Sequence, residues 1–103
     1  MSKRIVLANY SEIPEKIGQV FKINKEEIAV FRLSNGEVRA IENRSPHPKG
    51  GTLVDGLVSG EYIFCPVYDW KISLLDGKVQ APDEGQVKVY PIEVTGDKVY
   101  IQL

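Results

Sequence analysis

Apolar residues occur along this chain in short runs, and most of the runs alternate with polar residues at the period of two that is typical of β-strands. The ranges predicted as strands are 4–7, 19–23, 27–33, 38–42, 62–64, 70–74, 79–80, 87–90, 93–95 and 98–103. No window longer than about eight residues combines a 3.6-residue period with capping residues, so no helix is predicted. The pattern therefore predicts an all-β protein.

Pairs of turn-forming residues separate the predicted strands. Asn35-Gly36 is the sharpest hairpin signal, because both central positions of a type I′ turn need a positive φ. The chain is also expected to turn at Asn24-Lys25 and to close a two-residue hairpin at Gly96-Asp97. These turns favour an antiparallel β-sandwich, with a smaller loop subdomain at about residues 44–80 inserted between its strands.

Composition narrows the class of protein. A chain of 103 residues is long enough for one domain, so residues 1–103 are predicted to form a single unit. The formal net charge of −1 implies no surface for polyanions, and we expect no nucleic acid partner. A single cysteine excludes an intrachain disulfide and fits a reducing compartment. With no apolar run of membrane-spanning length and no signal-like N-terminus, we expect a cytoplasmic protein without a membrane partner.

The most informative stretch covers residues 45–70, SPHPKGGTLVDGLVSGEYIFCPVYDW. Two short proline-containing loops, at residues 45–47 and 65–68, lie at the ends of a glycine-rich segment. Glycine permits backbone angles that other residues avoid, so both loops can fold back toward one point. The stretch therefore predicts a site, or the remains of one, between the two loops.

The spacing Ser45-x-His47, 17 intervening residues and then Cys65-x-x-Tyr68 resembles the motif of Rieske [2Fe–2S] proteins. That family binds one iron by two cysteines and the other by two histidines. The resemblance implies a Rieske-like antiparallel β-sandwich over nearly the whole chain. The continuation at residues 69–73, DWKIS, is similar to the small subunit of assimilatory NAD(P)H-dependent nitrite reductase.

At two of the four ligand positions implied by this resemblance, the residue differs from the one in the family. Ser45 occupies a cysteine position and Tyr68 a histidine position, whereas His47 and Cys65 match. A serine hydroxyl is a poor substitute for a thiolate, and each iron would keep one good ligand. The first loop also has two residues before Gly50, where the family usually has one. We therefore expect no [2Fe–2S] cluster and no other metal; a Tyr68 phenolate on ferric iron is the alternative.

Other interpretations of the same residues remain open. His47 can simply hydrogen-bond a loop carbonyl while Cys65 packs against the sheet, as buried cysteines commonly do. A Cys–His nucleophilic pair is the catalytic alternative, but no third orienting group is recognisable, and we predict no catalytic residue. Tyr62, Phe64 and Trp70 are expected to form core under the loops.

Three functions follow as hypotheses. The resemblance implies a non-catalytic subunit of an oxidoreductase, bound to a large nitrite reductase subunit that carries flavin, an iron–sulfur cluster and sirohaem and reduces nitrite to ammonia. Its docking patch is predicted at the loop tip and comprises Pro46, His47, Pro66, Tyr68 and Trp70. The second hypothesis is a Rieske-type ferredoxin that carries electrons to an oxygenase or reductase, for which a cluster is required. The third is a regulatory or scaffolding module without an enzyme partner.

Overall fold

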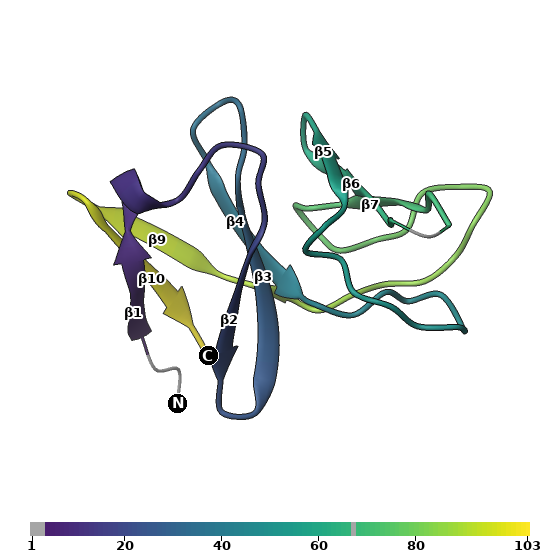
Figure 1. Ribbon diagram of the computed structural model, residues 1–103, viewed down its shortest axis with the longest axis horizontal. Helices are drawn as coiled ribbons and strands as arrows, with labels where there is room; N and C mark the ends of the chain where they lie inside the picture. The colour runs from purple at the N-terminus through teal and green to yellow at the C-terminus, as the bar shows by residue number, and fades with distance from the viewer. Residues whose placement is uncertain (1–3, 67) are drawn as a thin grey trace.

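The computed structural model describes residues 4–66 and 68–103, which form ten strands and one short 3₁₀ turn (Figure 1). The strands are β1 (Arg4–Asn9), β2 (Gln19–Ile23), β3 (Glu26–Arg32), β4 (Val38–Glu42), β5 (Leu57–Ser59), β6 (Tyr62–Phe64), β7 (Lys71–Ser73), β8 (Val89–Tyr90), β9 (Ile92–Thr95) and β10 (Lys98–Gln102). The 3₁₀ turn, η1, covers Tyr10–Glu12 and was not predicted. No helix in these residues has the length and apolar character needed to cross a membrane.

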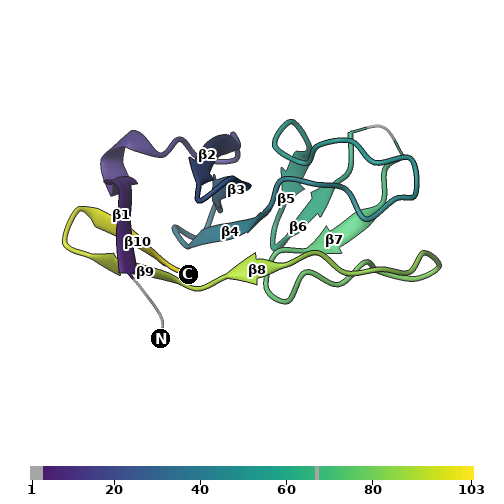
Figure 2. The same ribbon diagram turned by 90° about the horizontal axis from the view of Figure 1, so that it is seen from below.

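The strands form three antiparallel sheets, which confirms the all-β fold. The order is β1-β10-β9 in the first sheet, β2-β3-β4-β8 in the second and β5-β6-β7 in the third. The third sheet lies at the opposite end of the molecule from the first, with the second sheet between them (Figures 1 and 2). It also falls inside residues 44–80, the segment that we expect to form the inserted subdomain.

Strands β3 and β4 are buried on both faces, so they divide the interior into two cores. Ala29 and Phe31 of β3 pack with the residues of the third sheet, while Ile28 and Val30 pack with the first sheet. Both sets of side chains are fully buried. Burial on two faces explains why this strand is a continuous apolar run and not an alternating one.

Most predicted strands are present, with ends shifted by up to two residues. Strand β5 was not predicted, because Leu57–Ser59 is a short run between glycines. Residues 79–80 were predicted as a strand and do not form one; Val79 makes only an isolated bridge to Ile72. A single bridge leaves too few ladder bonds for a strand.

The type I′ turn lies at a different hairpin from the one predicted. Asn24 and Lys25 both have a positive φ, of 50° and 69°, and join Ile23 directly to its partner Glu26. At Asn35-Gly36 only the glycine has a positive φ. The hydrogen bond from the Leu33 N–H to the Glu37 carbonyl makes this connection a three-residue loop, a form that needs a positive φ at one position only. The predicted hairpin at Gly96-Asp97 is confirmed.

Asn43, directly after β4, fastens the loop region to the central sheet. Its side chain is 7 % exposed, and its Oδ1 accepts hydrogen bonds from the N–H groups of Leu53 and Val54, at 2.9 and 2.8 Å. Its Nδ2 donates to the Glu27 carboxylate on β3, and its own N–H donates to the Glu27 carbonyl. One buried amide therefore joins β3, the end of β4 and the segment that follows the first loop.

A second polar contact joins β8 to β3. The Tyr90 hydroxyl donates to Glu26 Oε1 at 3.1 Å, and the tyrosine is only 6 % exposed. Burial raises the pKa of Tyr90 to about 12, assisted by the hydrogen bond to Glu26 and by the negative charges of Glu26 and Glu42.

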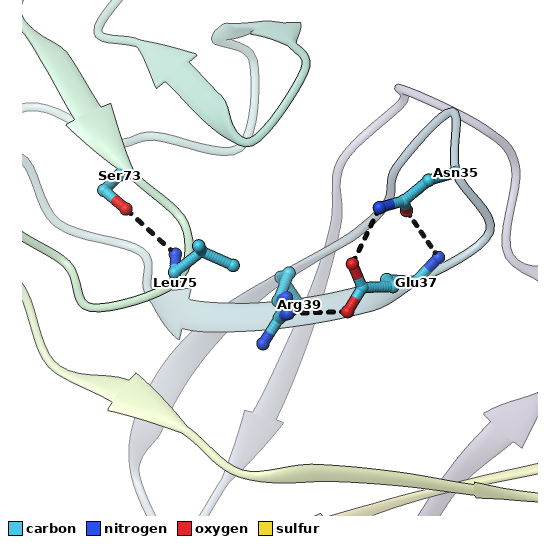
Figure 3. A network of polar contacts seen from close by, with 5 residues as sticks. All are labelled: Asn35, Glu37, Arg39, Ser73 and Leu75. Carbon is cyan, nitrogen blue, oxygen red and sulfur yellow. Dashed lines mark hydrogen bonds and ion pairs between the residues drawn. The ribbon is translucent and has the colours of Figure 1, made fainter.

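Replacing Asn43 by alanine is expected to lower the free energy of unfolding by at least about 2 kcal/mol, because it leaves two shielded backbone N–H groups without an acceptor. Asn35→Ala is the matched control: its Oδ1 also accepts a backbone N–H, from Glu37, and its Nδ2 also donates to a glutamate, but the side chain is exposed (Figure 3). Water can replace those bonds, so we expect a loss below about 1 kcal/mol. Urea unfolding measures the free energy of unfolding of both variants. Equal losses of stability would argue against Asn43 as the residue that fastens the loop region to the central sheet.

Stability should decline as the pH rises from about 10 to about 12. In this range the unfolded chain releases the Tyr90 proton while the folded chain retains it, so high pH favours unfolding. In the Tyr90→Phe variant the free energy of unfolding should fall less steeply over this pH range. Urea unfolding of both proteins at pH 9 to 11.5 would measure the difference. The same pH dependence in both proteins would contradict the attribution of this loss of stability to Tyr90.

Candidate functional site

Two loops meet at the end of the molecule that carries the third sheet. The first loop, residues 45–51, follows β4, and it is closed by a hydrogen bond from the Ser45 N–H to the Gly51 carbonyl at 2.9 Å. The second loop, residues 65–70 with residue 67 outside the described part, joins β6 to β7. It is closed by a bond from the Cys65 N–H to the Trp70 carbonyl, also at 2.9 Å. Each loop therefore has its own backbone closure.

The first contact between the loops joins Ser45 to Cys65. Their Oγ and Sγ atoms lie 3.3 Å apart, within hydrogen-bonding distance. Both residues are buried, at 4 % and 1 % exposed, and Cys65 belongs to the core that lies against the third sheet. The Ser45 hydroxyl oxygen also accepts the His47 N–H at 3.2 Å, so it helps to fix the turn of the first loop.

The second contact is an aromatic stack between His47 and Tyr68. Their ring centroids are 3.6 Å apart with an interplanar angle of 4°, and Trp70 meets the imidazole edge-on at 4.9 Å. His47 Nδ1 accepts the Lys49 N–H at 3.0 Å. The expected bond from the His47 side chain to a loop carbonyl is not found among the described residues.

These two contacts pair the four positions in the way that a Rieske cluster would pair them. Ser45 and Cys65 are the positions that the resemblance assigns to one iron, and His47 and Tyr68 are those of the other. In this structure each pair is in direct contact, and two ligands of one iron would also lie close together, so the distances alone do not decide whether a cluster fits. Only one thiol and one imidazole are available as strong donors. This donor set does not fit the two cysteines and two histidines that a Rieske [2Fe–2S] cluster requires.

The arrangement also offers little for other chemistry. The Cys65 thiol contacts Ser45 and not His47, so the described residues contain no Cys–His hydrogen bond to activate a nucleophile. Outside residues 1–3 and 67, no group of three or more His, Cys, Asp and Glu side chains comes together in a way that could hold a metal ion.

The loop tip presents aromatic and proline side chains at the surface. Tyr68 is 37 % exposed and Pro66 is exposed, whereas Pro46, His47 and Trp70 are half-buried. All five residues of the predicted docking patch lie on the two loops.

Several features of the site differ from the sequence prediction. Tyr62, Phe64 and Trp70 were expected as core, but all three are only half-buried, and Trp70 lies at the margin of the core. It was not predicted from the sequence that Asn43 joins the loop region to the central sheet. The available signal was its place, a polar residue between a predicted strand and the first loop. Asp69 was also missed, and its positive φ of 53° carries no sequence signature beyond its residue type.

Comparison with known proteins identifies the family. Residues 5–102 match the Rieske-like [2Fe-2S] domain family. The ferredoxin component of a naphthalene 1,2-dioxygenase system from Pseudomonas aeruginosa is 32 % identical over 95 residues, which cover 89 % of this chain and 88 % of that protein.

Nitrite reductases are also similar. The large subunit of NAD(P)H nitrite reductase from Klebsiella oxytoca is 28 % identical over 99 residues, which are 92 % of this chain but only 10 % of that protein. A crystal structure from Mycobacterium tuberculosis, described as a candidate NADH-dependent nitrite reductase small subunit, has a TM-score of 0.89 and 22 % identity over 100 % of this chain and 96 % of that one. This last likeness establishes a common fold.

The family match extends from β1 to the end of β10, and the ferredoxin relative is similar over nearly its whole length. The two-loop site described above lies inside both matched regions. The chain therefore belongs to the Rieske-like [2Fe-2S] domain family.

Proposed function

We propose that this chain is a small, non-catalytic subunit of an NAD(P)H-dependent nitrite reductase, an oxidoreductase that converts nitrite to ammonia, and that it binds the large subunit without carrying a cluster. The observation that supports the absence of a cluster is the donor set, because Ser45 and Tyr68 stand where the family has a cysteine and a histidine. Ser45 is in direct contact with Cys65, and His47 with Tyr68. In this proposal the two contacts hold the loops together, which is the mechanical task that the metal centre performs elsewhere in the family.

The proposed partner is supported by the Klebsiella relative. There, a segment similar to this chain is part of the same polypeptide as a nitrite reductase large subunit. A covalent link keeps two units at high effective concentration, and separate chains need an interface to achieve the same. We extend the proposal to a cytoplasmic location, where the single thiol of Cys65 stays reduced.

The proposed interface is the docking patch at the loop tip, comprising Pro46, His47, Pro66, Tyr68 and Trp70. The stack with His47 fixes the Tyr68 ring before binding, so little side-chain entropy is lost on association. Tyrosine has an apolar body and a polar tip, which suits a partly wet interface.

The second candidate is a Rieske-type ferredoxin that carries electrons to an oxygenase or reductase. It is favoured by the similarity to the dioxygenase ferredoxin component, which covers 88 % of that protein. This function requires a bound cluster, and the donor set, with serine and tyrosine at two of the four ligand positions, argues against it. Iron content therefore separates the two candidates.

Protein purified without oxygen should contain no iron and no acid-labile sulfide and should be colourless. The reason is the donor set, which offers one thiolate and one imidazole in place of two of each. The dioxygenase ferredoxin component, prepared in parallel, is the positive control. Two irons and two sulfides per chain, with a visible charge-transfer spectrum, would overturn the cluster-free proposal in favour of the electron carrier.

Binding to the large subunit should weaken when the patch is truncated. We expect Tyr68→Ala and His47→Ala each to raise the Kd at least about tenfold, as measured by titration calorimetry, because aromatic anchors dominate such interfaces. Tyr100→Ala is the matched control, since Tyr100 lies on β10 in the sheet at the opposite end of the molecule (Figure 1).

The control should bind like the wild type. Equal affinities for all three variants would move the interface away from the loop tip, and a wild type that does not bind the large subunit would reject the proposed partner.

A further inference from the structure

A groove on the outer face of the third sheet lies next to the docking patch. This β5–β6 groove has a volume of about 380 Å³ and is lined by Asp55, Leu57, Phe64, Pro66 and Asp69. It combines three apolar side chains with two carboxylates, and it extends from the second loop along the β5–β6 hairpin.

Leu57 is the feature of the groove that a free monomer does not explain. It is 71 % exposed, more than any other large apolar side chain in the described residues. Leu57 and Phe64 are directly paired across β5 and β6, so their side chains lie on the same face. The opposite face of this hairpin carries Val58 and Ile63, which are buried in the core. The exposed leucine therefore lies on the face that points away from the core.

The carboxylates give the groove a negative charge. Asp69 is held in place by a hydrogen bond from its N–H to the Cys65 carbonyl. Neither Asp55 nor Asp69 forms an ion pair with any residue in 4–66 and 68–103. Lys71, the neighbour of Phe64 on β7, places its ammonium 4.2 Å from the centre of the Tyr62 ring. The Lys71 cation is thus directed at an aromatic ring.

We propose that the β5–β6 groove is a second part of the docking face, and that it receives an apolar side chain of the large subunit with a lysine or arginine beside it. This inference rests on the proposed function and extends it to the chemistry of the partner. The apolar side chain would cover Leu57 and Phe64, and the cation would lie by Asp55 and Asp69. Pro66 belongs to both surfaces, and Asp69 lies between Tyr68 and Trp70, so the two parts are continuous.

Charge argues for a basic partner and against a second copy of this chain. In a symmetric dimer through the groove, the same patch would face itself. Asp55 and Asp69 of one copy would then approach the same carboxylates of the other, and like charges in an interface are unfavourable. A partner that supplies a cation converts this repulsion into attraction.

Two substitutions to lysine test the groove. Leu57→Lys removes the apolar anchor and adds a positive charge in the groove that is proposed to receive the partner's cation. Val6→Lys is the matched control, because Val6 is 53 % exposed and lies on β1, in the sheet at the other end of the molecule (Figure 1). We expect Leu57→Lys to raise the Kd for the large subunit at least about tenfold and Val6→Lys to leave it unchanged.

The charge component is tested by Asp55→Asn combined with Asp69→Asn. Asparagine keeps the shape of aspartate and tolerates the positive φ at position 69. This double variant should bind several-fold more weakly than the wild type at low salt, with a shallower dependence on ionic strength, because a screened attraction has been removed.

The outcomes separate this inference from the proposed function. If the wild type binds the large subunit and Leu57→Lys binds equally well, the groove is not part of the interface and only this inference fails. If the wild type does not bind at all, both fail. Sedimentation of the chain alone is expected to show a monomer; a dimer that Leu57→Lys abolishes would assign the groove to a second copy and overturn the inference.

Discussion

The two-sided burial of the β3–β4 hairpin is the constraint on which the rest of the structure depends. Alternate residues of β3 enter two separate cores, so a register shift of one residue would exchange the contents of both. One core holds the third sheet, and with it Cys65 of the second loop. Strand β4 leads through Asn43 into the first loop. The position of the site is therefore set by the central hairpin as much as by the loops themselves.

The two contacts between the loops lie in different surroundings and have different effects. Ser45 and Cys65 meet in the buried base of the site, where a polar pair is shielded from water. His47 and Tyr68 meet at the tip, where the stack leaves one ring partly exposed. The base therefore fixes the loops to the core, and the tip shapes the surface that a partner would meet. This division links the packing of the domain to its proposed role in docking.

Much of the fold could be predicted from the sequence, because the strand runs and turn residues act locally. The errors lie where tertiary structure decides. Asn35-Gly36 has the composition of a type I′ turn, yet the bond between Leu33 and Glu37 lengthens the loop. At Asn24-Lys25 the direct pairing of the flanking strands imposes a positive φ on two non-glycine residues. In the site, the motif identified the four positions, but its spacing could not reveal that they contact one another, since 17 residues separate His47 from Cys65.

The pairing of Ser45 with Cys65 and of His47 with Tyr68 has a consequence for how the chain matures. Both contacts are made by side chains encoded in the polypeptide, so the loops reach their shape as the domain folds. A metal centre would instead have to be built and delivered by other proteins before the loops were held. Under the cluster-free proposal, the supply of the finished domain would be set by translation and would stay the same when cellular iron becomes scarce.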